Sequence, residues 1–192
     1  LMGAGPVADA FFVALKLPNL FRRITAEGAF TVSFVPVYSG KLKKDGEAAA
    51  DEFAGNAFSV MLLILVPFTL LAMLAMPWII YAIAPGFHAG EPRYDLAVEL
   101  SRITFPYLLL MSLTSLLGGV MNAHERFAPY AAAPILFNLC MMIGIIVFTP
   151  VLQTPGHALA WGVFAAGVTQ LMWMYYSIRR AKIPFVFVRP RF

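Results

Sequence analysis

Long apolar runs dominate the chain, and charged residues interrupt them only at intervals. No Asp, Glu, Lys or Arg falls between Phe53 and Gly90, or between Phe127 and Ile178. A membrane-spanning helix needs about 20 apolar residues, so the first run can hold one span with a loop and the second can hold two. Barrel strands would alternate apolar and polar residues over about 10 positions, and these runs do not. The pattern predicts an all-α, polytopic transmembrane helix bundle.

Five spans are predicted within one transmembrane domain. They lie at about residues 7–38, 58–84, 96–121, 130–148 and 158–178 of the 192-residue chain. Pro18 and Pro36 are expected to bend the first span, because proline removes a backbone donor and crowds the preceding turn. Pro77 and Pro106 lie inside the second and third spans.

Composition supports a membrane location. Hydrophobic residues make up 60% of the chain, charged residues only 12%, and the mean hydropathy is +0.78. A soluble domain has about 25% charged residues. The net charge of +4 comes mostly from basic residues in loops beside the spans. That placement favours contact with membrane lipids and their anionic head groups rather than with nucleic acid. The lone Cys140 lies in an apolar run and is interpreted as a small buried hydrophobe.

Basic residues also predict the orientation. The loops 40–47, 122–129 and 179–192 carry nearly all loop Lys and Arg, and they share one side if all five spans form. The positive-inside rule places this side in the cytoplasm of a bacterium and the protein in its inner membrane. Residues 3–7 then lie outside the cell. A chain that starts in the cytoplasm would need another helix before Leu1, so we expect a fragment of a longer protein.

The first predicted span is unusual because it carries ionisable side chains. These are Asp9, Lys16, Arg22, Arg23 and Glu27. A charge in hydrocarbon costs at least about 2.5–3.5 kcal/mol, and such residues usually face a cavity or pair with one another. On an ideal helix all except Arg22 share a narrow sector. Two interpretations remain open: ion pairs that hold the helix to its neighbours, or the wall of a polar cavity.

Several sequence blocks then indicate a family. They are GAGPVADAFFVA at 3–14, LPNLFRRI at 17–24, AEGAF at 26–30, APGF at 84–87, RITFPY at 102–107 and ALAW at 158–161. Together these blocks closely resemble the MurJ (MviN) family of lipid II flippases, in the multidrug/oligosaccharidyl-lipid/polysaccharide exporter superfamily. The resemblance implies a MATE-like fold of two lobes that works by alternating access. It also implies that this chain holds most of the N-terminal lobe, without the first helix and the C-terminal lobe.

The resemblance further implies a binding site and a substrate. In the family, the matching arginine pair and aspartate line a cationic central cavity, so Arg22, Arg23, Asp9 and Glu27 become candidate substrate-binding residues. The implied substrate is lipid II, a peptidoglycan precursor linked to undecaprenyl diphosphate. Arginine suits a phosphate because its planar fork donates two parallel hydrogen bonds. Asp9 and Glu27 are expected to pair with the arginines when the site is empty.

No sequence motif predicts catalysis, a cofactor or a metal. The chain has no G-x-x-x-x-G-K-[ST] loop, no H-E-x-x-H motif and no Cys/His cluster. A transporter is therefore expected rather than an enzyme. Alternatives are a flippase for another polyprenyl-linked sugar, a drug or cation antiporter, a membrane enzyme acting on lipid diphosphates, and a scaffold without transport. An antiporter for cations would favour acidic residues, whereas the first span has three basic and two acidic ones.

Polar residues in the other spans have structural interpretations. Arg102 is expected to extend to the head groups. Asn138 and Gln170 are expected to form hydrogen bonds between helices, and Gly118 and Gly119 to allow close helix packing.

Overall fold

The computed structural model describes residues 5–25, 29–84, 86–87 and 90–190, and it describes side chains there except at residue 17 and in 21–25 and 29–31. In these residues the regular elements are helices. They are α1 (Pro6–Thr25), α2 (Ala29–Lys44), α3 (Glu47–Leu74), α4 (Met76–Ile83), α5 (Pro92–Thr104), α6 (Tyr107–Ala123), α7 (Ala128–Ala131), α8 (Ala133–Phe148) and α9 (Pro155–Arg180).

Four helical segments of the described chain are long and apolar enough to cross a membrane. They are Glu47–Leu74, Pro92–Ala123, Ala128–Phe148 and Pro155–Arg180. The first of these begins well before the predicted residue 58, because the Ala-rich stretch 48–57 continues the helix. The predicted span 7–38 corresponds to α1 and most of α2, and residues 26–28 between them lie outside the described residues.

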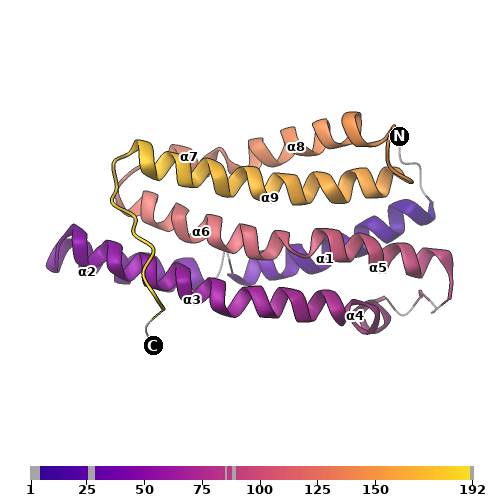
Figure 1. Ribbon diagram of the computed structural model, residues 1–192, viewed down its shortest axis with the longest axis horizontal. Coiled ribbons are helices and arrows are strands. Elements are labelled where there is room, and N and C mark those ends of the chain that lie inside the picture. Colours follow the sequence, from indigo (N-terminus) through magenta and orange to yellow (C-terminus); the bar gives the residue numbers. More distant parts are fainter. Residues whose placement is uncertain (1–4, 26–28, 85, 88–89, 191–192) are drawn as a thin grey trace.

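The helices form a layered bundle with α6 near its centre (Figure 1). Helix α6 contacts α2 and α3 on one side and α9 on the other, and α8 packs mainly on α9. The most apolar stretch of the α7–α8 segment is only 11% buried, and that of α3 only 17%, against 78% for the α5–α6 segment. Outward-facing apolar surface on α3 and α8 is what a membrane-embedded bundle presents to lipid.

Pro77 breaks the second predicted span between α3 and α4, at Ala75. Proline has no N–H, so the carbonyl of Met73, four residues earlier, loses its helical donor. The Nε–H of Arg102 on α5 donates to that carbonyl oxygen at 3.0 Å. Arg102 is exposed, as expected, but it also satisfies a backbone group that a proline has freed.

A similar bond joins α5 to α1. Pro18 lies inside α1 and frees the carbonyl of Ala14. The hydroxyl of Thr104, at the end of α5, donates to this carbonyl oxygen at 3.2 Å. Pro106 follows and separates α5 from α6. Two side chains of α5 thus donate hydrogen bonds to backbone carbonyl groups that prolines have left without a helical donor.

Buried apolar residues form two cores. The first joins α1, α4, α5 and the first half of α6 to α9. We call it the far-end core, because it lies away from the basic end described below. Its members are Ala10, Phe11, Val13, Ala14, Ala72, Met76, Ile80, Ala84, Phe87, Tyr94, Ala97, Val98, Leu100, Phe105, Tyr107, Leu108, Met111, Ala160 and Val163.

The basic-end core lies at the other end of the bundle. Its members are Phe34, Tyr38, Ala50, Ala54, Phe58, Leu113, Leu116, Leu117, Val120, Met121, Met174, Ile178, Ile183 and Phe185. The links 40–47 and 122–129 and the end of α9 meet at this end, on the left of Figure 1, and we call it the basic end.

A polar network crosses the basic-end core. The Tyr38 hydroxyl on α2 donates to Oδ1 of Asp51 on α3 at 3.0 Å, and Nε2 of His124 lies 3.0 Å from the same hydroxyl oxygen. Tyr38 and Asp51 are buried, and Oδ2 of Asp51 has no hydrogen-bond partner among the described residues. Buried polar groups require partners, so this network ties three segments together.

The segment after α9 also packs on this core. Phe185 and Phe187 meet the ring of Phe58 edge to face, at centroid distances of 5.5 and 5.3 Å. The hydroxyl of Ser59 donates to the carbonyl oxygen of Val188 at 2.6 Å. The tail crosses α3 (Figure 1) and covers its first half.

Candidate substrate-binding site

Helix α1 has one buried face and one exposed stripe, which carries polar side chains together with Phe12 and Leu20. Ala10, Phe11, Val13 and Ala14 are buried, and α1 packs mainly against α5. The side chains at 9, 12, 16, 19 and 20 are exposed and recur at helical spacing. The stripe includes Asp9, Lys16 and Asn19, so its polarity is not buried within this chain.

Asp9 forms an ion pair with a residue outside its own helix. Its Oδ2 lies 3.8 Å from Nη1 of Arg93 at the start of α5. Arg93 also donates from Nη2 to the carbonyl oxygen of Gly86 at 2.8 Å and lies over the Phe87 ring. The Asp9 side chain is 57% exposed, and exposed pairs contribute about 0–1 kcal/mol. The pair joins α1 to the start of α5 without burying the carboxylate.

The predicted arginines lie in the last part of α1. Arg22 and Arg23 belong to the helix, and their side chains lie outside the described ones. Arg23 is seven residues after Lys16, and Lys16 seven after Asp9, so the helical register places all three along one line. Arg22 falls on another sector. Glu27 lies outside the described residues. Their roles in binding stay predictions.

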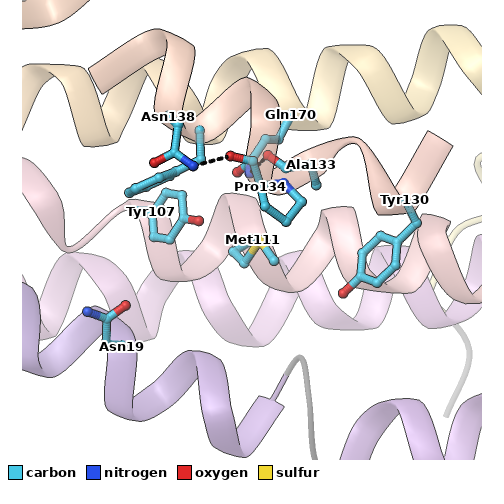
Figure 2. A pocket seen from close by; sticks show the side chains of 9 residues that line it. Asn19, Tyr107, Met111, Tyr130, Ala133, Pro134, Asn138 and Gln170 are labelled. Atoms are coloured by element: carbon cyan, nitrogen blue, oxygen red, sulfur yellow. Dashed lines mark hydrogen bonds between the residues drawn. The ribbon is translucent and has the colours of Figure 1, made fainter. Parts of the chain in front are cut away.

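A pocket of about 380 Å³, mainly apolar but with several hydrogen-bonding side chains in its lining, lies beside the exposed stripe of α1. Asn19 of α1 lies across this space from side chains of α7, α8 and α9, with Tyr107 and Met111 of α6 between them (Figure 2). Tyr130 and Asn138 add polar atoms to its lining. A pocket with several hydrogen-bonding side chains is unusual inside an apolar bundle, where polar groups are costly.

Gln170 fixes the pocket wall formed by α8 and α9. Its Nε2 donates to the carbonyl oxygen of Ala133 at 2.7 Å, so the predicted bond between helices forms. Gln170 is 2% exposed, and its Oε1 has no partner among the described residues. Asn138 donates instead to Pro134 of its own helix at 3.0 Å. The prediction of an interhelical bond was therefore wrong for Asn138, because a carbonyl one turn earlier is within reach.

The close-packing prediction for the two glycines holds. A Cβ on Gly118 would collide with the ring of Tyr130, and one on Gly119 would lie 3.2 Å from the Phe34 and Val35 side chains. Tyr130 can therefore lie against α6, where its hydroxyl is 3.2 Å from Oγ of Ser115. Absence of a side chain at Gly118 helps to place Tyr130 at the pocket.

The sequence did not single out Asn19, Tyr107 or Tyr130. Asn19 carried a usable signal, since it lies three residues after Lys16 and four before Arg23, on the same helical face. The tyrosines carried none, because their position depends on how α6 and α7 pack against α1 and α9. Chemically, the pocket offers neutral hydrogen-bonding groups next to a charged helix.

These features define a polytopic α-helical membrane protein in which an exposed charged stripe of one helix lies beside a pocket with hydrogen-bonding side chains. The family model for the lipid II flippase MurJ matches residues 1–192. A probable lipid II flippase MurJ from Rhizobium tropici is 40% identical over 195 residues, covering 100% of this chain and 37% of the relative. A probable lipid II flippase MurJ from Rickettsia prowazekii is 38% identical over 185 residues, covering 96% and 36%. The chain belongs to the MurJ family of lipid II flippases.

A solved structure shares the fold. The lipid II flippase MurJ in an inward closed conformation superposes with a TM-score of 0.75 at 23% sequence identity, over 96% of this chain and 38% of that one. The lipid II flippase MurJ of Burkholderia cenocepacia is 33% identical over 98% of this chain and 37% of the relative. The chain thus spans little more than a third of the length of these proteins.

Proposed function

We propose that this chain is most of the N-terminal lobe of a lipid II flippase and works as part of a longer protein. Membership of the MurJ family supports the flippase activity. The chain covers only 37% of the length of one relative, and this supports the proposal that it works as part of a longer protein. The observation that carries the proposal is that Asp9, Lys16 and Asn19 are exposed along α1, beside a pocket with hydrogen-bonding side chains, in a bundle whose outer helices are apolar. Such a stripe is costly unless water or a polar substrate lies against it.

In this proposal the substrate's head group passes along α1. Arg22 and Arg23 attract the diphosphate, since charge-assisted hydrogen bonds to phosphate are the strongest that a side chain can offer. Asp9 and Glu27 keep the cationic helix paired and hydrated when substrate is absent, and Arg93 already pairs with Asp9. Asn19 and the neutral pocket face uncharged polar parts of the head group.

The proposed location is the bacterial inner membrane, with the basic end in the cytoplasm. The basic residues of the two links and of the end of α9 lie at that end (Figure 1). They are Lys41, Lys43, Lys44, Arg126, Arg179, Arg180 and Lys182. Arg93 lies at the opposite end, so the asymmetry fits the positive-inside rule. The proposed protein is a transporter and not an enzyme, and it changes the leaflet of the lipid without changing its bonds.

Reconstitution of the full-length protein with radiolabelled lipid II tests the proposal. Wild-type protein should move lipid II between leaflets and leave it chemically intact. Arg22→Ala should slow translocation about tenfold or more, which is what the loss of one hydrogen bond to a charged group costs. Arg179→Ala, at the exposed end of α9, removes the same charge away from the stripe and should keep the wild-type rate.

Each result separates the proposal from a rival. Cleavage of the labelled lipid would indicate an enzyme acting on lipid diphosphates. Transport of other polyprenyl-linked sugars or of cationic drugs, without lipid II, would indicate another exporter of the superfamily. A normal rate in a correctly inserted Arg22→Ala protein would remove Arg22 from the site.

A further inference from the structure

A second concave site lies at the basic end, away from α1. A groove of about 610 Å³ runs between the α6–α7 link and the last turns of α9. Its lining includes Glu125, Arg126 and Phe127 from the link, and Trp173, Tyr176 and Arg180 from α9. The neutral pocket beside α1 shares none of these residues, so the two sites are distinct.

Hydrogen bonds fix the α6–α7 link and join it to α9. Glu125 has a φ of 58°, a left-handed conformation that turns the chain sharply after α6. The N–H of Arg126 then donates to the Met121 carbonyl oxygen at 2.9 Å. Across the groove, Nε1 of Trp173 donates to the carbonyl oxygen of Pro129 at 3.0 Å. The two walls are therefore joined by a direct hydrogen bond.

The charges in the groove favour an anion. Arg126 and Arg180 are both exposed, and in the described part of the chain neither guanidinium forms an ion pair. Glu125 is the one carboxylate in the lining, so a net positive charge remains. Guanidinium groups bind phosphate oxygens through pairs of parallel hydrogen bonds.

The groove also has an apolar side that points to a lipid. Phe127 is 60% exposed and Tyr176 is 54% exposed. Aromatic side chains of this kind gather where a protein crosses the head-group region. Helix α7 carries the chain from the groove lining into α8, which has exposed apolar side chains at Ile135, Leu139, Met142, Ile143 and Ile146. A ligand with a phosphate head and acyl chains fits both parts, whereas a soluble anion uses only the first.

We propose that this groove binds the phosphate head group of an anionic phospholipid in the leaflet at the basic end, with an acyl chain along α8. Basic pockets between helices on the cytoplasmic side of membrane proteins bind anionic lipid head groups in this way. The site does not take part in the passage of lipid II along α1. Its occupancy can therefore be measured without a translocation assay.

The test measures lipid binding to the full-length protein by native mass spectrometry. The probes are phosphatidylglycerol and phosphatidylcholine with identical acyl chains. Phosphatidylglycerol should bind more tightly, and Arg126→Gln and Arg180→Gln should each weaken it about fivefold. Arg179→Gln removes the adjacent charge, which lies over Tyr175 outside the groove, and should change binding less than twofold. Glu125→Gln should tighten binding, a gain that misfolding cannot imitate.

Three results would overturn the proposal. Equal binding of the two lipids would show that the groove does not select an anionic head group. An equal loss in Arg179→Gln would show attraction to the whole basic surface rather than to the groove. Displacement of bound phosphatidylglycerol by inorganic phosphate, or by lipid II at equal concentration, would assign the groove to a soluble anion or to the transported substrate.

Discussion

The two cores of the bundle both pack apolar side chains, and the basic-end core also contains a buried network of ionisable groups. In the far-end core, large apolar side chains such as Phe105, Met76 and Leu100 are almost completely buried. The basic-end core buries apolar side chains such as Leu116 and Met174 just as completely. It also contains the polar network of Tyr38, Asp51 and His124, and the tail after α9 covers one side.

The difference concerns what can loosen each end. Apolar packing depends on shape and on contacts that salt or protons do not change. A buried network of ionisable groups depends on complete pairing and is costly when one partner is lost. We therefore expect the far end to support α1 regardless of salt or pH. The stability of the basic end, in contrast, should depend on a single hydroxyl group, that of Tyr38.

The largest expected effect is a cavity in the far-end core. Phe105→Ala should lower the free energy of unfolding by about 3–5 kcal/mol, as truncation of a buried Phe does. Unfolding of the protein in nanodiscs by heat or denaturant measures the change. Phe12→Ala provides a matched control, because Phe12 is 63% exposed on α1. Equal losses in the two variants would mean that the far-end core is not the support described above.

A smaller loss is expected from the network at the basic end. Tyr38→Phe removes the hydroxyl that contacts both Asp51 and His124 and should cost about 1–3 kcal/mol, or more while the Asp51 carboxylate is charged. Tyr81→Phe, on an exposed tyrosine of α4, should have almost no effect. In a double-mutant cycle, Asp51→Asn should cost less in the Tyr38→Phe background than alone. Strict additivity would contradict coupling between the two side chains.

The smallest effect is expected to stay local. A Cβ on Gly55 would collide with the carbonyl oxygen of Val186, so Gly55→Ala should lift the tail from α3. Hydrogen exchange should rise in residues 183–188 with little change in global stability. Gly40→Ala is the control, because a Cβ there meets nothing within 4 Å. Unchanged exchange in Gly55→Ala would show that the tail does not depend on this contact.

The sequence predicted the features that depend on local pattern. Apolar runs located the helices, and the prolines at 77 and 106 lie close to the breaks between α3 and α4 and between α5 and α6. Close packing at Gly118 was also predictable, because two adjacent glycines in an apolar span leave room for a neighbour.

The features that depend on distant contacts were not predictable. Tyr38 and His124 are separated by 86 positions, and nothing in either neighbourhood indicates the other. The pair between Asp9 and Arg93 has the same origin, since it requires that α1 lie against the start of α5. At the candidate site, the charges of α1 could be found from sequence, whereas the pocket beside Asn19 arises only when five helices meet.

The central claim is that the charged helix α1 recognises the diphosphate of the substrate. The most direct measurement compares the binding of undecaprenyl diphosphate and of undecaprenol to the full-length protein, with and without Arg22→Gln and Arg23→Gln together. Wild-type protein should prefer the diphosphate, and the double variant should lose that preference by about tenfold or more, with undecaprenol binding unchanged. An undiminished preference in a folded double variant would contradict the claim.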